Sequence, residues 1–172
     1  MLGSYLEKLG YYFLPETAGL LISGGLTAGE RADSTFDKKV MSLEFARDNC
    51  YCSSNRKVQI VETWHPGNIA YAMARSSPIV CAYKNRFLRS LQKFDVKCLI
   101  LDVSPRTSCL RSLKLQKPTI NSHSFLVKVK KFTTIVIEEF ELVSVTIDST
   151  KSSEFVTHKA LEILQSWFSK SE

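Results

Sequence analysis

Stretches with the apolar periodicity of helices alternate along the chain with short apolar runs typical of strands. The runs that predict strands are rich in β-branched or aromatic residues and end at polar or turn-forming residues. They cover residues 11–14, 57–62, 96–103 and 142–148. The run at 96–103, VKCLILDV, shows little alternation of apolar and polar positions, which is typical of a strand covered on both faces of its sheet.

Helices are predicted where apolar residues recur every three to four positions. These stretches are residues 2–9, 17–23, 27–49, 69–77, 78–94, 105–115 and 151–169. Residues 63–68, TWHPGN, predict a turn between a strand and a helix. Residues 123–141 fit two structures, because Phe125 and Val129 have helical spacing whereas the segment TTIVI favours a strand.

The alternation of strands and helices predicts the α/β class, with right-handed βαβ units and a mostly parallel sheet between layers of helices. The length of 172 residues predicts one domain with a sizeable core. No apolar run reaches the ~18 residues of a membrane-spanning helix. Glu7 and Lys8 follow the start too closely for a signal peptide. We therefore expect a cytoplasmic protein without a membrane partner.

The five cysteines give no pattern of a metal site or a disulfide framework. Their number is odd, and the C-x-C pair of Cys50 and Cys52 has no second pair at zinc spacing. We expect reduced thiols and no bound metal held by cysteine.

The net charge of +6 is concentrated in the middle of the chain. Residues 84–131 hold 12 basic and 2 acidic side chains, whereas residues 1–83 are balanced and residues 132–172 have a net charge of −4. Such a block is typical of anion binding, with phosphate as the small anion and nucleic acid as the large one. A solvated basic face explains it equally well.

Four segments resemble, in order and spacing, a known enzyme family. They are YLEKLGYYFLPETA, QIVETWHPGNIAYA, CLILDVSPRTSCLRS and VSVTIDSTKSSEFVTHKALEIL. Together they are similar to the nucleoside and nucleotide kinases of the P-loop fold, with thymidylate kinase-like proteins closest. The resemblance implies a three-layer P-loop NTPase-like fold. It also implies Mg²⁺-dependent phosphoryl transfer from ATP to a nucleoside or a nucleotide such as dTMP, and it is compatible with a homodimer.

The chain departs from this family at the phosphate loop, G-x-x-x-x-G-K-[ST], whose backbone N–H groups cradle phosphates. The near-match from Gly24 to Gly29 is followed by Glu30 and Arg31, and Glu30 would repel a phosphate. We therefore predict an ordinary turn there, before a helix capped by Thr27 with Glu30 in capping-box spacing. Mg²⁺ and ATP are expected only if the full-length protein carries a phosphate loop, and the sequence as it stands predicts an inactive kinase.

In the family, the strand before the phosphate loop is central and lies between the strands predicted at 57–62 and 96–103. Its loss would leave buried backbone groups without partners, at ~1–3 kcal/mol each. Three alternatives follow: the flanking strands pair directly, another segment or a partner fills the place, or the protein is longer. We favour the last, so that residues 1–172 form a single kinase-like domain that is incomplete at its N-terminus.

Two glutamates follow predicted strands, at the sheet edge where α/β proteins bind ligands. By resemblance, Glu16 contacts the acceptor sugar or acts as a base. Glu62 stands in place of the family's Asp and orients Mg²⁺ or accepts the proton of the substrate hydroxyl. Thr63 replaces the arginine that follows that Asp. The structural alternatives are a charge that favours the dipole of a helix for Glu16 and an exposed strand end for Glu62.

Three residues of the turn at 63–68 are candidates for substrate binding. Trp64 would stack on a base, and His65 or Asn68 would hydrogen-bond it; a packed turn with Asn68 as a helix cap is the alternative. Arg75 lies further along the next predicted helix. By resemblance it contacts the acceptor phosphate, and otherwise it is a surface charge.

Four basic residues surround the expected lid over the phosphates: Arg106, Arg111, Lys114 and Lys117. Arg111 fits the family pattern best, and lid arginines neutralise charge in the transition state. An exposed basic helix is the alternative. The rival function for the whole chain is a non-catalytic module that binds nucleic acid or regulates a partner through residues 84–131, for which affinity would fall steeply with salt.

Overall fold

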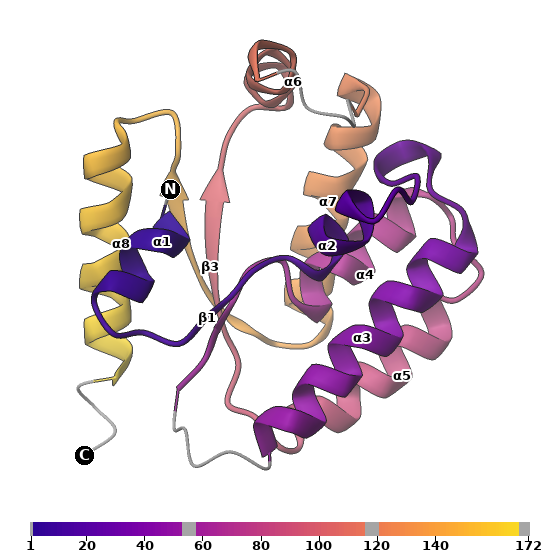
Figure 1. The fold of residues 1–172 in the computed structure, drawn as a ribbon, viewed down its shortest axis with the longest axis horizontal. Helices are drawn as coiled ribbons and strands as arrows, with labels where there is room; N and C mark the ends of the chain where they lie inside the picture. The colour runs from indigo at the N-terminus through magenta and orange to yellow at the C-terminus, as the bar shows by residue number, and fades with distance from the viewer. Residues whose placement is uncertain (1, 53–57, 116–120, 169–172) are drawn as a thin grey trace.

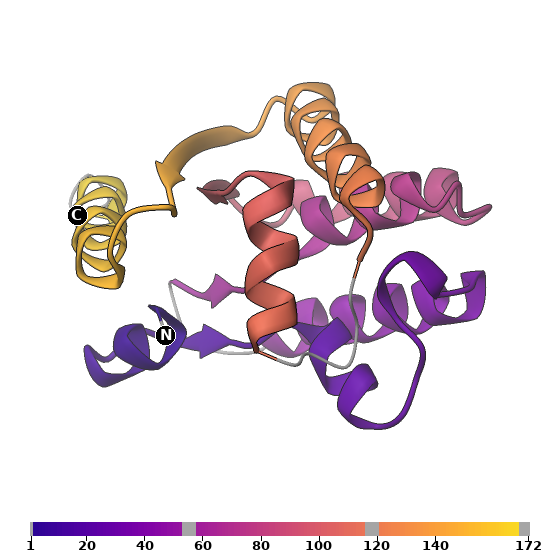
Figure 2. The same ribbon diagram turned by 90° about the horizontal axis from the view of Figure 1, so that it is seen from above.

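The structure is a computed structural model that describes residues 2–52, 58–115 and 121–168. It is an α/β protein, as expected, with helices on both sides of short strands (Figures 1 and 2). The helices are α1 (Leu2–Lys8), α2 (Thr17–Ser23), the 3₁₀ turn η1 (Gly29–Arg31), α3 (Ser34–Cys52), α4 (His65–Ala74), α5 (Val80–Leu91), α6 (Pro105–Lys114), α7 (His123–Glu139) and α8 (Ser153–Phe168). The strands are β1 (Phe13–Leu14), β2 (Ile60–Val61), β3 (Lys97–Asp102) and β4 (Val143–Asp148).

The strands form two separate parallel pairs instead of the single sheet that the sequence predicts. β1 pairs with β2, and β3 pairs with β4 from Lys97 opposite Val143 to Asp102 opposite Asp148. β1 and β2 are shorter than the predicted strands at 11–14 and 57–62. Within the described chain β2 does not pair with β3, so the first alternative for a missing central strand, direct pairing of its neighbours, does not occur.

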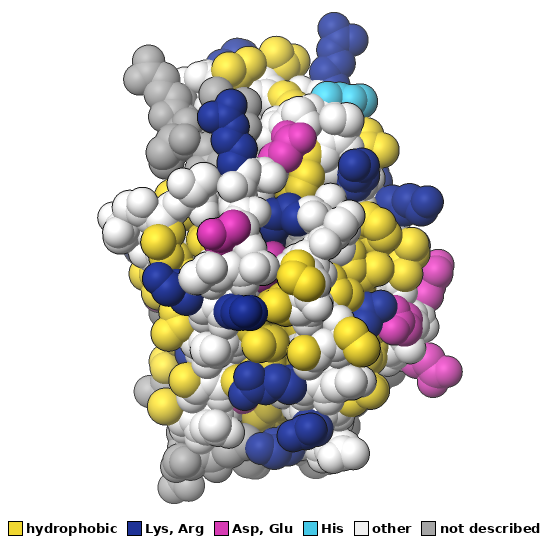
Figure 3. Space-filling model, turned by 90° about the vertical axis from the view of Figure 1, so that its right-hand side faces the viewer, with side chains coloured by type: hydrophobic (Ala, Val, Ile, Leu, Met, Phe, Trp, Pro, Cys, Tyr) yellow, Lys and Arg dark blue, Asp and Glu magenta, His cyan; other side chains and the backbone are white. Residues whose placement is uncertain are grey.

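The basic residues of the block 84–131 are spread over α5, β3, α6 and α7. Three of its lysines form ion pairs: Lys84 with Glu139, Lys97 with Asp95, and Lys130 with Asp102. On the face that carries α3 and α5, Lys and Arg side chains are interleaved with hydrophobic ones (Figure 3). The block therefore does not form one continuous basic patch in the described chain. Its charged side chains lie on several elements, and three of them are paired with acidic groups.

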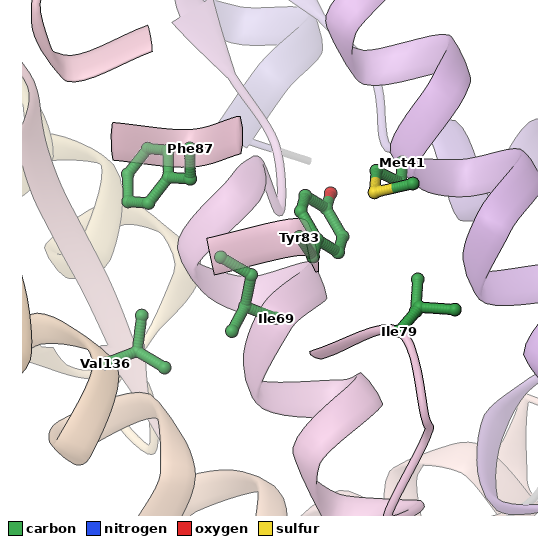
Figure 4. Close-up of a cluster of buried hydrophobic side chains, with 6 residues drawn as sticks. All are labelled: Met41, Ile69, Ile79, Tyr83, Phe87 and Val136. Carbon is green, nitrogen blue, oxygen red and sulfur yellow. The ribbon is translucent and has the colours of Figure 1, made fainter. Parts of the chain in front are cut away.

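The largest core lies between α3, α4, α5 and α7 (Figure 4). Its buried members are Met41, Ile69, Ile79, Tyr83, Phe87 and Val136. α4 is at its centre, where Ile69, Ala70 and Ala72 are 0% exposed. The small alanine side chains let α7 pack closely against α4, because no bulky group separates the two backbones.

A smaller core joins β4 to α8 through Ile147, Val156 and Ala160, with Leu99 of β3 packed against it. β3 itself is only partly buried, and Leu101 is 44% exposed. The expectation of a strand covered on both faces is therefore wrong for β3. In the described chain it pairs on one side only, so its apolar residues have fewer neighbours.

Two helix starts differ from the prediction by four residues or more. The helix expected from 27 begins at Ser34, because the Asp33 carboxylate accepts the N–H groups of Thr35 and Phe36, both at 3.0 Å, and Thr27 is not the cap. The helix expected from 69 begins at His65, because Pro66 fits the first turn, where its missing N–H has no intrahelical role.

Residues 123–141, for which the sequence allows two structures, form helix α7 to Glu139. The Ser122 hydroxyl accepts the N–H of Phe125 at 3.2 Å and caps the helix. Val136, from the β-branched segment TTIVI, is 0% exposed in the main core. Tertiary packing therefore outweighs the strand preference of that segment.

Three further observations concern the described residues. None of their helices is both long and apolar enough to cross a membrane. No group of three or more His, Cys, Asp or Glu among them is arranged to hold a metal ion. The four cysteines with described side chains, Cys50, Cys81, Cys98 and Cys109, are free thiols.

Candidate functional site

A cleft of about 250 Å³ opens between α2, α3, α4 and α6. Its polar lining residues are Glu16, Asp37, Asn68, Tyr71, Arg75, Tyr83, Ser108, Ser112 and Asn121. Of the site residues predicted from the sequence, the cleft brings together Glu16, Asn68 and Arg75. It is the strongest candidate for a functional site in the described chain.

Arg75, the residue that follows α4, is fixed on the cleft wall by several contacts. Its Nη1 donates to the carbonyl oxygen of Gly29 at 2.9 Å, and its Nη2 forms an ion pair with the carboxylate of Asp37. The guanidinium carbon lies 5.9 Å and 5.8 Å from the ring centres of Phe36 and Tyr71. These contacts hold the side chain in one orientation, so Arg75 is a built part of the wall and not a surface charge.

One donor and one acceptor of this ion pair have no hydrogen-bond partner in the described residues: Arg75 Nε and Asp37 Oδ2. The two side chains are only 7% and 3% exposed. A buried polar atom without a partner costs ~1–3 kcal/mol, and such atoms are few in native proteins. Both residues line the cleft, and these two atoms lie buried within its wall.

Glu16 enters the cleft from the end of β1, at the N-cap of α2. Burial is the main cause that raises the pKa of the nearby Tyr71 phenol, and the negative charge of Glu16 adds to it, whereas Arg75 opposes it. The phenol therefore remains protonated at neutral pH. The cleft thus holds a carboxylate and a neutral hydroxyl close together, an arrangement suited to polar groups of a ligand.

Asn68 is buried in the first turns of α4 and lies beside Tyr83 in the lining. Its Nδ2 donates to the Thr63 carbonyl at 2.8 Å and to Glu44 Oε1 at 3.4 Å. It is therefore a fixed wall residue, and the interpretation as a helix cap is wrong. Burial raises the pKa of the Glu44 carboxyl, with its partner Arg47 at 3.3 Å as an opposing influence.

The bond from Asn68 closes a strained turn. Thr63 has a φ of 44°, in the left-handed region that β-branched residues rarely adopt. A Cβ on Gly67 would lie 3.0 Å from Thr63 Cγ2, a tight contact that the Thr63 side chain would have to relieve by moving slightly. Such strain is concentrated at functional sites and switch regions of proteins, and here it lies between β2 and the cleft wall.

Trp64 and His65 contribute to a buried polar network around Asp48 and do not line the cleft. The Asp48 carboxylate accepts hydrogen bonds from His65 Nε2 at 2.8 Å, from Ser90 Oγ at 2.7 Å and from Trp64 Nε1 at 3.1 Å. All three donors bond to the one carboxylate of Asp48, so this network holds α3 against α4 and α5.

His65 is completely buried, and its ring stacks on Phe45 with the centroids 4.4 Å apart. Because Nε2 donates to Asp48, Nδ1 accepts the hydroxyl proton of Tyr83 at 3.3 Å. Burial is the largest influence on the pKa of His65 and lowers it, although Asp48 acts in the opposite direction. His65 is therefore a neutral core residue, as the packed-turn alternative predicts.

Glu62 follows β2 and is exposed, outside the lining of the cleft. Its backbone N–H donates to the Leu14 carbonyl at 2.9 Å and extends the pairing of β2 with β1. Glu62 and Glu16 thus follow the ends of two paired strands at the same edge, as predicted, but only Glu16 reaches the cleft.

The basic residues of the predicted lid that the structure describes do not line the cleft. Arg106 and Lys114 are exposed on α6, and Arg111 donates to the Ser149 carbonyl at 3.0 Å. Lys117 lies outside the described residues. α6 turns Ser108 and Ser112, one helical turn apart, toward the cleft instead. The side of the cleft formed by α6 therefore presents serine hydroxyl groups in place of the predicted basic side chains.

The Gly24–Gly29 segment links α2 to the turn η1. Gly24 ends α2 and donates to the Leu20 carbonyl at 3.1 Å, and Leu26 donates to the Leu21 carbonyl at 3.1 Å. The N–H of Glu30, the next residue, donates to Asn121 Oδ1 at 2.9 Å. Glu30 and Arg31 stand where a phosphate loop carries its Lys and its Ser or Thr, so this segment does not fit ATP.

Sequence reasoning missed Asp37, Tyr71, Ser108 and Ser112. A signal was present for Asp37. It lies beside the apolar residues Phe36 and Val40 of its predicted helix, and a carboxylate that is buried with them needs a charged partner. Tyr71 lies within a segment that carries the family resemblance. Ser108 and Ser112 gave no signal, because their role depends on how α6 is oriented.

Neither a scan against protein-family models nor a comparison with curated proteins finds a match to this chain.

Proposed function

We propose that the protein binds a nucleoside or a nucleotide in this cleft, as a thymidylate kinase-like protein would at its acceptor site. The observation that carries the proposal is the wall formed by Arg75 and Asp37, with a buried donor and a buried acceptor that lack partners in the described chain. Tyr71, which is partly buried, adds an aromatic ring to the lining that can contact a base.

The finer fold that we propose is a three-layer P-loop-like arrangement in which a further strand lies between β2 and β3. Three features support it: helices on both sides of the strands, two separate parallel pairs, and an apolar β3 that pairs on one side within the described residues. A strand in that place would cover the exposed apolar residues of β3, Leu101 among them. Backbone groups on both neighbours would gain hydrogen bonds.

The described residues do not by themselves account for phosphoryl transfer, because Glu30 and Arg31 follow Gly29 where a phosphate loop carries its Lys and its Ser or Thr. Mg²⁺ takes one or two carboxylates together with substrate phosphates, and Glu16 and Glu62 are carboxylates at the same strand edge. If a phosphate loop is present in a longer form of the protein, ATP and Mg²⁺ would supply the transferable phosphoryl group. The proposal for residues 1–172 is therefore one of binding.

Calorimetric titration with deoxynucleosides and their 5′-monophosphates tests the proposal. The variant Ser112→Leu places a larger side chain in the cleft from α6, a helix with no buried residue among those described, so folding should be little affected. We expect it to weaken binding at least about tenfold. Ser166→Leu, the same change at an exposed position of α8, should leave binding unchanged. Equal affinities of the two variants would contradict the proposal.

Nucleic-acid binding is the second candidate, because three exposed basic residues, Arg86, Arg89 and Lys93, lie on or beside α5. Its hallmark is a steep linear fall of log affinity with log salt. Substitution of these three residues with Gln should then abolish binding of a single-stranded oligonucleotide and leave binding of a nucleoside intact. If the oligonucleotide does not bind at low salt, this second candidate is wrong.

A further inference from the structure

The outward side of α6 is an apolar surface that the described chain leaves uncovered. The helix stands at one end of the molecule, beyond β3 (Figure 1), and none of its residues is buried. Ser108 and Ser112 face the cleft, whereas Leu110 and Leu113 are 52% and 54% exposed. Because successive helical residues are turned by about 100°, the two leucines lie on the side of α6 that faces away from the cleft.

Two basic side chains extend this surface at both ends. Arg106 and Lys114 lie one helical turn before and one after Leu110, on the same side of the helix. Both are exposed and form no ion pair with a described residue, and α6 contains no Asp or Glu. We call Arg106, Leu110, Leu113 and Lys114 the outer face of α6. It places an apolar centre between two positive charges.

The stability of α6 itself does not explain this arrangement. Arg106 lies in the first turn, where a positive charge opposes the helix dipole, and an exposed leucine contributes little to folding. A carboxylate from another molecule near Arg106 would be attracted both by the guanidinium group and by the positive end of the dipole. The outer face therefore fits a partner that is apolar at its centre and acidic beside it.

The charges and the shape of the outer face distinguish between its possible occupants. A second copy of the chain, bound through the same face, would bring Arg106 and Lys114 against basic residues like themselves, and such contacts repel. A bilayer takes up a helix through a wide apolar side, often with aromatic residues, whereas α6 has two leucines in its outer face and no aromatic residue. Leucines three residues apart are instead the usual contact between two helices.

We propose that the outer face of α6 binds an acidic amphipathic helix of a partner protein. Leu110 and Leu113 pack against the apolar stripe of that helix, and carboxylates beside the stripe pair with Arg106 and Lys114. The two charges orient the partner along α6 and speed its association. This interaction is independent of a ligand in the cleft, since Ser108 and Ser112 face the cleft from the other side of the helix.

The test is fluorescence anisotropy with a labelled synthetic peptide, a helix of Leu, Ala and Glu whose leucines form one stripe. It should bind the full chain at low ionic strength. Replacing Leu110 and Leu113 together with Ser should weaken binding at least about tenfold. The matched control replaces Leu43 and Leu88, which are 42% and 50% exposed on α3 and α5, and should leave the affinity unchanged.

A second pair of variants tests the charges. Replacing Arg106 and Lys114 together with Glu should weaken binding of the acidic peptide at least about tenfold and remove most of its dependence on salt. Replacing Arg89 and Lys93 with Glu, on or beside α5, changes the net charge of the protein by the same amount. That control should retain the affinity, because the effect depends on where the charges lie.

Four results would overturn the proposal. In the first, the acidic peptide does not bind at low ionic strength. In the second, the α5 controls weaken binding as much as the variants of the outer face. In the third, a scrambled peptide of the same composition binds equally well, so that the apolar stripe is not recognised. In the fourth, the loss of Leu110 and Leu113 abolishes binding to phosphatidylserine vesicles or self-association of the chain and leaves peptide binding unchanged.

Discussion

Apolar side chains around α4 and apolar side chains of β3 are buried to very different degrees. Around α4 the side chains of Ile69, Tyr83 and Phe87 are at most 1% exposed, and a polar network with satisfied donors joins α3, α4 and α5. β3 contains the apolar run from Cys98 to Leu101, yet Leu101 is 44% exposed. Local hydrophobicity therefore does not ensure burial, which depends on how many neighbours the topology supplies.

The cleft lies between the well-packed elements around α4 and the helix α6, which has no buried residue among those described. Asp37, Asn68 and Arg75 are held by buried contacts, whereas Ser108 and Ser112 are supplied by a loosely packed helix. Walls held in place by α3 and α4, with the less buried helix α6 on the remaining side, suit a site that must admit a ligand and then enclose it.

The largest expected effect contrasts one core residue with one strand residue. Phe87→Ala should lower the free energy of unfolding by about 3–5 kcal/mol, because it leaves a cavity in the main core. Leu101→Ala should cost less than about 1.5 kcal/mol, because nearly half of the side chain already contacts solvent. Urea unfolding of both variants measures the difference, and similar losses would contradict the contrast between the two regions.

The next effect concerns the buried network. Asp48→Asn should cost about 2–3 kcal/mol, because an amide offers one acceptor oxygen to three donors and adds an NH₂ group that needs partners. Asp33→Asn is the matched control, since asparagine also caps helices well, and it should be nearly neutral. Equal chemical-denaturation midpoints for the two variants would show that the network contributes little.

A smaller effect is expected from acid. The pKa of His65 in the folded protein lies below the unfolded value near 6.5, so the unfolded chain binds more protons between the two values. This contribution of His65 to stability is complete above pH 6.5 and is lost as the pH falls through that window. An NMR titration of the His65 ring measures its pKa directly, and a value above 6.5 would contradict the burial argument.

The smallest effect is a difference in reactivity on β3. Burial raises the pKa of the Cys98 thiol to about 11, against an ordinary 9.0. At pH 8 its thiolate fraction should be about 100-fold lower than that of an ordinary thiol, so alkylation should be slower than at exposed Cys50 and Cys81. Mass spectrometry of alkylated peptides follows each site. Equal alkylation rates at Cys98 and at the exposed cysteines would contradict this expectation, because they would show that β3 opens readily to solvent.

Much of the order of elements could be predicted from the sequence, because apolar periodicity and turn residues act locally. α1 spans Leu2–Lys8 where a helix is predicted at residues 2–9, and α7 follows the helical spacing of Phe125 and Val129. Helix starts were less accurate, since both Thr27 and Asp33 are capable caps and only the folded chain selects Asp33. The division of the strands into two pairs depends on long-range contacts, which the local pattern does not contain.

The candidate site was predicted only in part, for a physical reason. Glu16 was found because it follows a predicted strand, which is a local signal, and Arg75 because of the resemblance to the kinase family. Trp64 and His65 have the chemistry of a binding turn, but Asp48, distant in the sequence, draws them into the core. The partner of Arg75, Asp37, lies 38 residues away, and no local pattern connects them.

The central claim is that the cleft between α2, α3, α4 and α6 is a nucleoside-binding site. Its most direct test is an NMR titration of the ¹⁵N-labelled protein with the four deoxynucleosides. We predict shifts of backbone amides around Glu16, Asp37, Arg75 and Ser112, with none along α8. Shifts confined to α5 or α8, or no shifts with any of the four, would contradict the account.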